Sequence, residues 1–381
     1  MDLTRAATPG FFATMAIEHA YLRRQAAHRP PTAGDYERRD TLTSLAMGTA
    51  SVLAPVVAER VLGPFVPGRG RFGRALVAGA VGAAVVTTVA DRVRRRARRR
   101  ARRRGRPEEW AGAEPPAAEP RDRVTVVADR TARIGGAAAV AAGGVALGLY
   151  WNDRTRPDVL WARRRLPDLG RGPLALAFAV LGWDFVYYWN HRWMHTSRQA
   201  WAYHVVHHSS EHYNLSTALR QPVAGPVTVF VPYGLLALLG LRPEVIEAAR
   251  GVNLIYQYWI HTETIRRLGR AEAVWNTPSH HRVHHGSNPR YLDRNHGSIL
   301  VLWDRWFGTF AEEDDAEPVV YGLTKNLDSF DPVVVAGREY VAMLRDVADA
   351  PDWRTRLAFV LRGPGWAERH RPVPVPAPAA A

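Results

Sequence analysis

Long apolar stretches recur along this sequence of 381 residues, and they constrain its fold more than any other feature. An α-helix needs about 20 apolar residues to cross the hydrocarbon core of a bilayer. The stretches that approach this length are residues 42–66, 75–90, 134–151, 173–189 and 222–241, with a weaker one at 252–260 and an amphipathic one at 11–21. A soluble core helix would explain any one of them, but together they predict an all-α, multi-span transmembrane helical bundle.

A run of arginines separates the second apolar stretch from the third. Eleven arginines between positions 92 and 106 account for most of the formal net charge of +15. Glu-, Pro- and Ala-rich sequence follows, so we predict that residues 91–132 form a disordered Arg-rich loop. Basic loops favour the cytoplasmic side of a membrane and attract anionic lipid head groups. We prefer this interpretation to a nucleic-acid-binding arm and expect no nucleic-acid partner.

A cytoplasmic Arg-rich loop also predicts an orientation. The stretch 134–151 would leave the cytoplasmic side, and the stretch 173–189 would return to it. The region 222–260 would cross and return in the same way, which places every histidine cluster that follows these stretches on the cytoplasmic face. The sequence uses much Arg, Ala, Gly and Pro and little Lys, which is typical of a GC-rich bacterial genome. We therefore expect the protein in a bacterial plasma membrane.

Histidine is concentrated in one part of the chain, since 12 of the 15 histidines lie between positions 191 and 296. His191 and His195 are four residues apart, so a helix places both on one face. A second pattern has two histidines three residues apart and a third directly after them. It occurs twice, as His204, His207 and His208 and as His281, His284 and His285. We expect His204 and His207 to share a face and His208 to turn about 100° away, towards a second ion.

This set of side chains predicts a metal centre. The chain has no cysteine, so thiolate sites are excluded and any metal must be held by His, Asp or Glu. His261, after an aromatic segment, is a further candidate ligand. Eight or nine imidazoles exceed the four ligands of a tetrahedral zinc site, so two ions are the natural number. Imidazole suits Zn, Cu, Fe and Ni alike, and ligand type does not choose among them.

Each ligating imidazole needs a hydrogen-bond partner for its other ring nitrogen. The candidate supporting residues lie close to the histidines in sequence: Asp184, Glu211, Asn214, Gln257, Glu263, His280, Asp293 and Asp304. We expect no catalytic side chain beyond the metal centre. His212 and His296 lie outside the repeated spacing and are expected to support the site or to lie at the surface.

Several segments resemble the sterol desaturase and fatty acid hydroxylase superfamily, and within it the alkylglycerol monooxygenase family. They are DFVYY at 184–188, HHSSEHYNLSTALR at 207–220, YQYWIHTE at 256–263, NTPSHHRVHHG at 276–286 and WDRWFGTF at 303–310. The resemblance covers roughly residues 11–66 and 133–341. It does not extend to the Arg-rich loop, and His296 stands where relatives often carry tyrosine.

The resemblance implies a membrane-bound di-iron oxygenase that hydroxylates the alkyl chain of a lipid with O2, with its histidine-rich cap on the cytoplasmic side. The implied ligands of two ferrous ions are His191, His195, His204, His207, His208, His261, His281, His284 and His285. In alkylglycerol monooxygenases, hydroxylation beside the ether oxygen gives a hemiacetal that breaks down to an aldehyde and glycerol. The electrons would come from tetrahydrobiopterin or another external reductant, such as an electron-donor protein.

The resemblance and the apolar pattern together predict four parts of the chain. They are N-terminal transmembrane helices in 1–90, the Arg-rich loop in 91–132, a di-iron catalytic domain in 133–345 and a C-terminal tail in 346–381. Three alternatives stay open on the sequence alone: a sterol or fatty acyl desaturase or hydroxylase, a histidine-rich metal-binding membrane protein, and a zinc hydrolase.

Overall fold

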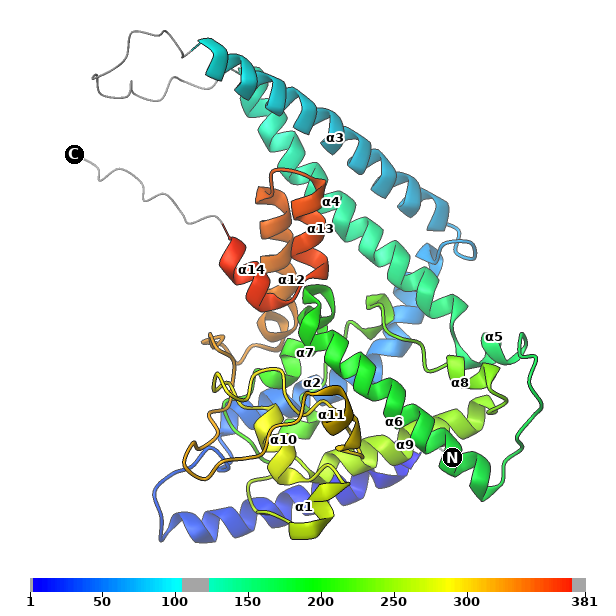
Figure 1. The fold of residues 1–381 in the computed structure, drawn as a ribbon, viewed down its shortest axis with the longest axis vertical. Helices are drawn as coiled ribbons and strands as arrows, with labels where there is room; N and C mark the ends of the chain where they lie inside the picture. Colours follow the sequence, from blue (N-terminus) through cyan, green and yellow to red (C-terminus); the bar gives the residue numbers. More distant parts are fainter. Residues whose placement is uncertain (1–2, 105–122, 372–381) are drawn as a thin grey trace.

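The computed structural model describes residues 3–104 and 123–371, and these form an all-helical molecule (Figure 1). No β-strand occurs in these two ranges, where Trp275 and Leu300 pair in an isolated antiparallel bridge. The predicted all-α fold is therefore confirmed. The α-helices are α1 Leu3–Ala26, α2 Arg38–Leu62, α3 Gly73–Arg104, α4 Arg123–Arg154, α5 Pro157–Trp161, α6 Pro173–Thr196, α7 Arg198–His208, α8 Leu235–Leu238, α9 Pro243–Trp259, α10 Pro278–His284, α11 Leu302–Phe307, α12 Pro332–Asp349, α13 Trp353–Leu361 and α14 Pro364–His370. Short 3-10 helices are η1 Gly63–Phe65, η2 Thr217–Leu219, η3 Gly225–Val227 and η4 Gly269–Ala273.

Local sequence sets where many of these helices begin. Proline is the first residue of α5, α6, α9, α10, α12 and α14, a position where its missing N–H costs no hydrogen bond. The side chains of Asp331 and Asp352 cap α12 and α13 by accepting hydrogen bonds from backbone N–H groups. The helix starts are therefore largely encoded by neighbouring residues.

Within residues 3–104 and 123–371, three helices are long and apolar enough to cross a membrane: Arg38–Phe65, Gly73–Ala97 and Arg123–Arg154. They confirm the predicted stretches 42–66, 75–90 and 134–151, and the chain is an integral membrane protein. The stretches 173–189 and 252–260 lie in α6 and α9, which do not meet the same criterion of length and composition. The stretch 11–21 lies in α1.

The predicted span at residues 222–241 is wrong. This segment holds the 3-10 helix η3 and the four-residue helix α8, with irregular backbone between them. Pro222, Pro226 and Pro232 remove backbone donors at intervals that do not allow a continuous helix. The predicted topology therefore loses the membrane crossing that this stretch was expected to make. The location of the histidines on the cytoplasmic side stays a prediction.

The predicted disordered loop at 91–132 is also wrong over part of its length. Residues 91–104 continue α3 and residues 123–132 begin α4, while residues 105–122 lie outside the described part of the chain. Arginine is a good helix former, and no glycine or proline interrupts the run before Gly105. The helices α3 and α4 pack side by side along much of their length (Figure 1).

Much of the predicted C-terminal tail is folded as well. Residues 353–361 and 364–370 form α13 and α14, which lie with α12 beside α4 and α7 (Figure 1). Phe359 and Ala367 are buried in a small apolar core there, and the buried Arg356 pairs with Asp91 of α3. Apolar burial and this ion pair give the segment the fixed structure that its composition did not predict. The four-part domain division itself stays a prediction.

Replacing Arg356 by alanine is expected to destabilise the junction between α13 and the α3–α4 pair. The Arg356 guanidinium lies 2.5 Å from the Asp91 carboxylate, which also accepts a hydrogen bond from Arg94. Removing one partner of a buried ion pair costs about 3–5 kcal/mol when the other charge is left unpaired, and because Arg94 still pairs with Asp91 the expected loss is at or below the lower end of this range. Thermal unfolding of the detergent-solubilised protein should show a clearly lower Tm for Arg356→Ala, whereas the exposed neighbour Arg354→Ala should match the parent. Equal Tm values for the parent and both variants would contradict this role.

Candidate metal centre

The ends of four helices meet in the lower part of the molecule and bring the predicted histidines together. His191 and His195 lie near the C-terminal end of α6, and the next helix, α7, carries His204, His207 and His208. His261 follows α9 after one residue, and α10 supplies His281 and His284, with His285 directly after it. All nine side chains are buried.

The nine histidines form two groups in which one ring nitrogen per residue lies within 4.8 Å of the others. The five-histidine group contains His191, His195, His204, His208 and His284. The four-histidine group contains His207, His261, His281 and His285. Each three-histidine segment of the sequence therefore contributes to both groups.

The expected division of the α7 histidines is wrong in one respect. His204 and His208 belong to the same group, and His207 belongs to the other. Residues four apart on an α-helix differ by about 40° in direction, whereas residues three apart differ by about 60° in the opposite sense. Either spacing could therefore bring two rings of α7 into one group. The packing of α6 and α10 around α7 selects the spacing of four, which joins His204 and His208.

Short contacts between ring nitrogens mark the centre of each group. His204 Nε2 lies 2.9 Å from His191 Nε2 and 3.0 Å from His208 Nε2. His261 Nε2 lies 3.1 Å from His207 Nε2 and 3.0 Å from His281 Nε2. A metal–nitrogen bond of about 2.1 Å places two donor atoms about 3 Å apart when they subtend a right angle at the ion. The observed separations match that spacing.

Backbone carbonyls fix the protonation of three of these rings. The Nδ1 atoms of His191, His261 and His284 lie 2.8, 2.7 and 2.9 Å from the carbonyl oxygens of His296, Gln257 and Arg294, in that order. A carbonyl can only accept, so each Nδ1 carries the hydrogen and each neutral ring presents a bare lone pair at Nε2.

Lone pairs that face one another at 3 Å repel unless a positive charge lies between them. His261 Nε2 presents its lone pair to two neighbouring Nε2 atoms. Among the described residues, the buried Nε2 atoms of His195, His284 and His285 have no hydrogen-bond partner. Buried polar atoms are normally satisfied. The unpartnered donor atoms and the convergent lone pairs therefore fit bound metal ions.

The protonation equilibria of the site favour the metal-binding form. Burial, followed by the effect of neighbouring imidazoles, lowers the pKa of His204, His208 and His285 well below the usual range for histidine. Burial has the same effect on the pKa of His284. These rings are neutral at physiological pH, and neutral imidazole is the form that binds metal. The protonation state and the convergence of the rings therefore suit metal binding by imidazole.

The loop between α10 and α11 presents two of the orienting carbonyls. Asp293 and Asn295 flank Arg294 and have positive φ angles of 58° and 55°. Asn and Asp tolerate this left-handed backbone better than other residues with a side chain. The Asn295 side chain holds the turn by donating to the carbonyls of His280 and Ala311. The resulting conformation aims the carbonyls of Arg294 and His296 at the histidine rings.

Asp184 lies in α6 two turns before His191 and organises this region without touching a histidine ring. Its buried carboxylate accepts hydrogen bonds from the side chains of Ser298, Trp303 and Asn253 and from the backbone N–H groups of Ile299 and Leu300. Asp184 therefore anchors the segment that follows His296, whose carbonyl orients His191.

A second branch leads from Asp184 to the four-histidine group. Asn253, on α9, donates to Asp184 and accepts a hydrogen bond from the side-chain amide of Gln257 at 2.5 Å. The backbone carbonyl of Gln257 accepts from His261 Nδ1. One carboxylate is thus linked by hydrogen bonds to a histidine of each group.

The other predicted supporting residues lie around the site in different roles. Asp304 accepts from the backbone N–H groups of His296 and Gly297, so it also holds the loop. Asn214 donates to the carbonyls of Gly34 and Asp35 just before α2, and Glu263 accepts from Tyr321. Glu211 is exposed. The ring nitrogen Nδ1 of the buried His280 lacks a partner, and His280 belongs to neither group.

Several contacts at the centre come from residues outside the repeated histidine spacing. His296 is buried, and its ring centroid lies 4.9 Å from that of His195. Asp293 Oδ1 lies 3.2 Å from His195 Nδ1, so Asp293 is a carboxylate partner of this ring. Tyr213 stacks on Tyr321 and lies 5.1 Å from the His285 ring. These residues come from loops, where sequence spacing carries no information about direction.

Comparisons with known proteins agree with this geometry. Residues 176–309 match the family model "Fatty acid hydroxylase". The alkylglycerol monooxygenase of Homo sapiens is 44% identical over 208 residues, which cover 54% of this chain and 46% of that protein. The Danio rerio protein of the same name is 47% identical over 188 residues, or 49% of this chain and 42% of that protein. An ornithine lipid hydroxylase of Rhizobium tropici is 25% identical over 149 residues, or 37% and 43% of the two chains. No solved structure matches.

The chain spans less than half the length of these relatives, and the matching family model includes all nine histidines of the two groups. The family model and the identities above 40% confirm the resemblance drawn from the histidine segments. Residues 176–309 therefore carry a fatty acid hydroxylase domain, and about half of the chain is similar in sequence to alkylglycerol monooxygenases.

Proposed function

We propose that this protein is a membrane-bound di-iron monooxygenase that uses O2 to hydroxylate the alkyl chain of a lipid. The observation that carries the proposal is the pair of buried groups of neutral imidazoles, with lone pairs turned inward. Nitrogen ligands of this kind suit redox-active metals, and the superfamily and its relatives favour iron. The nine proposed ligands are His191, His195, His204, His207, His208, His261, His281, His284 and His285.

The proposed reaction inserts one oxygen atom of O2 into a C–H bond and releases the other as water, with two electrons and two protons from outside. Two iron ions supply the redox chemistry that O2 activation needs. The protein holds the rings in one tautomer through the carbonyls of His296, Gln257 and Arg294. Burial of every histidine in both groups keeps bulk water from the ligand atoms.

The names of the relatives suggest the substrate class. Alkylglycerol monooxygenases and an ornithine lipid hydroxylase act on lipids, so we propose a lipid with a long alkyl chain as the substrate. An alkylglycerol hydroxylated beside its ether oxygen would give a hemiacetal, which breaks down to an aldehyde and glycerol. Tetrahydrobiopterin or an electron-donor protein would provide the electrons.

We further propose the orientation and surroundings of the molecule. The Arg-rich end of α3 follows the apolar segment of a candidate span, as expected of a cytoplasmic helix end in contact with anionic head groups. We propose that α4 leaves this side and that α6 returns to it, so that the histidine groups lie on the cytoplasmic face of a bacterial plasma membrane. The four-part domain division, with the catalytic part at 133–345, completes this proposal.

Metal analysis and O2 consumption test the proposed function directly. Membrane-extracted protein is expected to contain about two iron ions per chain, in line with two separate imidazole groups. Incubation with an alkylglycerol, a sterol or a fatty acid in the presence of O2 and reduced pterin should give a product one oxygen heavier, or an aldehyde, by lipid mass spectrometry. Chelation should remove both iron and turnover, and added Fe²⁺ should restore them. Full turnover without a transition metal, or without O2, would contradict the proposal.

A further inference from the structure

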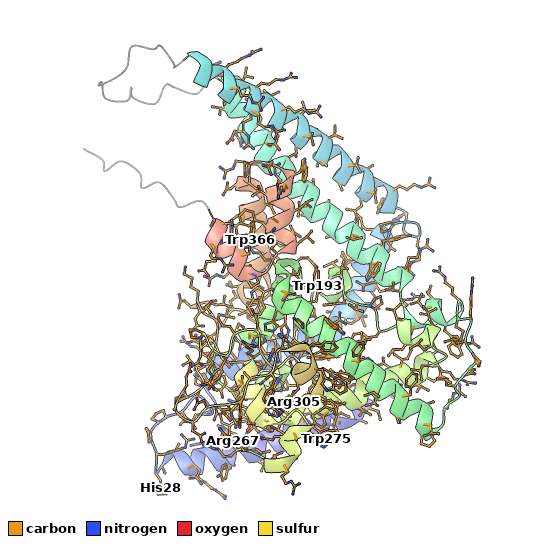
Figure 2. All side chains as sticks on the ribbon, viewed as in Figure 1. His28, Trp193, Arg267, Trp275, Arg305 and Trp366 are labelled. Carbon is orange, nitrogen blue, oxygen red and sulfur yellow. The ribbon has the colours of Figure 1, made fainter. Side chains whose placement is uncertain are left out.

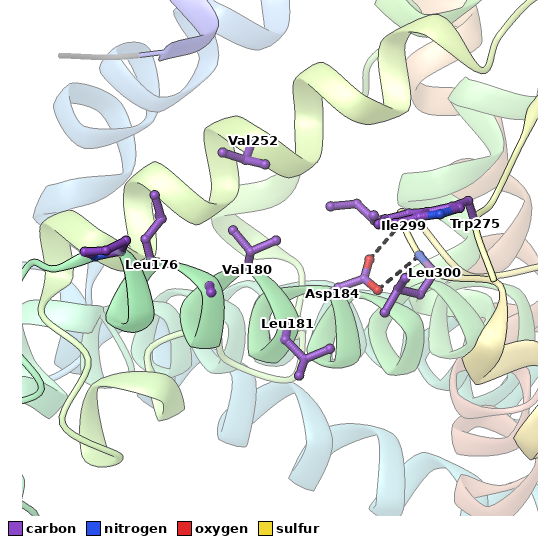
Figure 3. Close-up of a pocket in the computed structure, with 10 residues that line it drawn as sticks. Leu176, Val180, Leu181, Asp184, Val252, Trp275, Ile299 and Leu300 are labelled. Carbon is purple, nitrogen blue, oxygen red and sulfur yellow. Dashed lines mark hydrogen bonds between the residues drawn. The ribbon is translucent and has the colours of Figure 1, made fainter. Parts of the chain in front are cut away.

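An apolar groove runs between α6 and α9, outside the histidine groups. Its volume is about 440 Å³, and Figure 3 shows Leu176, Val180 and Val252 along its walls. Ile299, Leu300 and Trp275 line the groove beside Asp184 (Figure 3). Among the lining side chains, only Asp184 and Trp275 carry polar atoms: the carboxylate oxygens and the ring nitrogen.

The groove offers nothing to a polar ligand. Both oxygens of Asp184 already accept hydrogen bonds, from Ile299 and Ser298 on one side and from Leu300 and Trp303 on the other. A peptide segment in the groove would bury backbone donors and acceptors without partners, at a high cost in free energy. A hydrocarbon chain has no hydrogen-bonding groups, so its entry leaves no buried polar group without a partner.

The groove continues into an exposed apolar surface on α6. Leu174 is 85% exposed, and Phe178 and Leu181 are 45% and 46% exposed. A contiguous exposed apolar surface of this kind marks contact with an apolar phase or partner. Since three helices of the described chain are candidate membrane spans, this apolar phase is the hydrocarbon core of the bilayer. The groove therefore opens where lipid chains are available.

Length and position distinguish a bilayer lipid from the reacting substrate. From Pro173 to Asp184 the α6 wall advances about 16 Å, about half of the 30 Å hydrocarbon core and so the reach of one chain of one leaflet. Asp184, the lining residue of α6 nearest to the histidines, lies about 10 Å along the helix from His191. A chain in the groove thus stops short of the proposed ligands.

We propose that this groove binds one hydrocarbon chain of a bilayer phospholipid, whichever lipid the enzyme oxidises. The bound chain packs against Ile299 and Leu300, whose N–H groups Asp184 holds. These residues directly continue the segment of His296, the carbonyl partner of His191. The chain bound in the groove therefore supports, from the membrane side, the loop beside the five-histidine group.

Photo-crosslinking tests the occupant. The full chain is reconstituted in nanodiscs of phosphatidylcholine with a diazirine on one acyl chain, and crosslinked residues are mapped by mass spectrometry. We expect labels on Val180, Val252 and Ile299, together with labels on the exposed Val57 of α2 as a reference for general lipid contact. Ala177→Trp fills the groove from an exposed position and should abolish the groove labels while Val57 stays labelled.

Matched variants and a second lipid keep the test decisive. Leu174→Trp, on the same helix but outside the groove lining, should leave the groove labels intact. If Ala177→Trp does not fold, Val252→Trp fills the groove from the other wall. Absence of groove labels in the parent, or their persistence in both filling variants, would overturn the proposal. A trace of diazirine-labelled alkylglycerol that displaces phospholipid from the groove would also overturn it and identify the substrate as the occupant.

Discussion

Replacing His208 by alanine is expected to abolish turnover and to reduce bound iron from about two ions to about one per chain, because each histidine group is proposed to hold its own ion. His208 Nε2 lies 3.0 Å from His204 Nε2 at the centre of the five-histidine group. Even residues that only orient a ligand typically cost 10–100-fold in metal affinity or activity when mutated, so loss of a ligand should cost more. His284→Ala, in the same group, should behave in the same way.

The control for this experiment is an exposed histidine. His28 lies at the edge of the molecule, near the end of α1 and away from both groups (Figure 2). His28→Ala should keep the iron content and turnover of the parent, and all three variants should insert into membranes and elute as folded protein. Iron content is measured by elemental analysis and turnover by lipid mass spectrometry. Unchanged activity in both His208→Ala and His284→Ala would remove these residues from the ligand set.

Replacing Asp184 by asparagine is expected to lower iron affinity about 10–100-fold, the range typical of residues that support metal ligands. Five donor groups converge on the Asp184 carboxylate, which is 1% exposed. An asparagine amide would turn its own N–H groups towards some of these donors and leave them unsatisfied. Because the network leads to His191 and to His261, the affinity for both iron ions should fall.

Two further variants separate positioning from general stability. Asn253→Leu breaks the branch to Gln257 and His261 but leaves the backbone contacts of Asp184, so it should weaken iron binding mainly in the four-histidine group. Asp168→Asn is a matched control at the surface, where a hydrogen bond from Arg242 lowers the pKa of Asp168 to about 2. It should leave iron binding unchanged. Iron titration followed by optical and Mössbauer spectroscopy gives the readout, and parent-like iron affinity in Asp184→Asn would refute the positioning role.

The sequence also predicted some elements incorrectly for reasons that are physical. Residues 222–241 are apolar enough for a span, but Pro222, Pro226 and Pro232 prevent a continuous helix. Residues 91–104 are highly charged, yet they are helical, and Asp91 and Arg94 are buried in an ion-pair network with Arg356. Composition reports average polarity, whereas helix continuity depends on single breakers and burial depends on distant partners.

The sequence by itself determined the helical class and the nine histidines that the fold gathers, because hydrophobic periodicity and residue spacing act locally. It predicted more membrane spans than the three helices of the described chain that are long and apolar enough. Only the tertiary structure decided how the histidines divide into two groups, since His204 and His208 join His284 across helices while His207 joins His261. It also decided that the carbonyls of His296, Gln257 and Arg294 orient three of the rings and that the Asp293 carboxylate contacts a fourth, His195. Backbone carbonyls exist at every residue, so their direction depends on loop conformation and cannot be read from residue type.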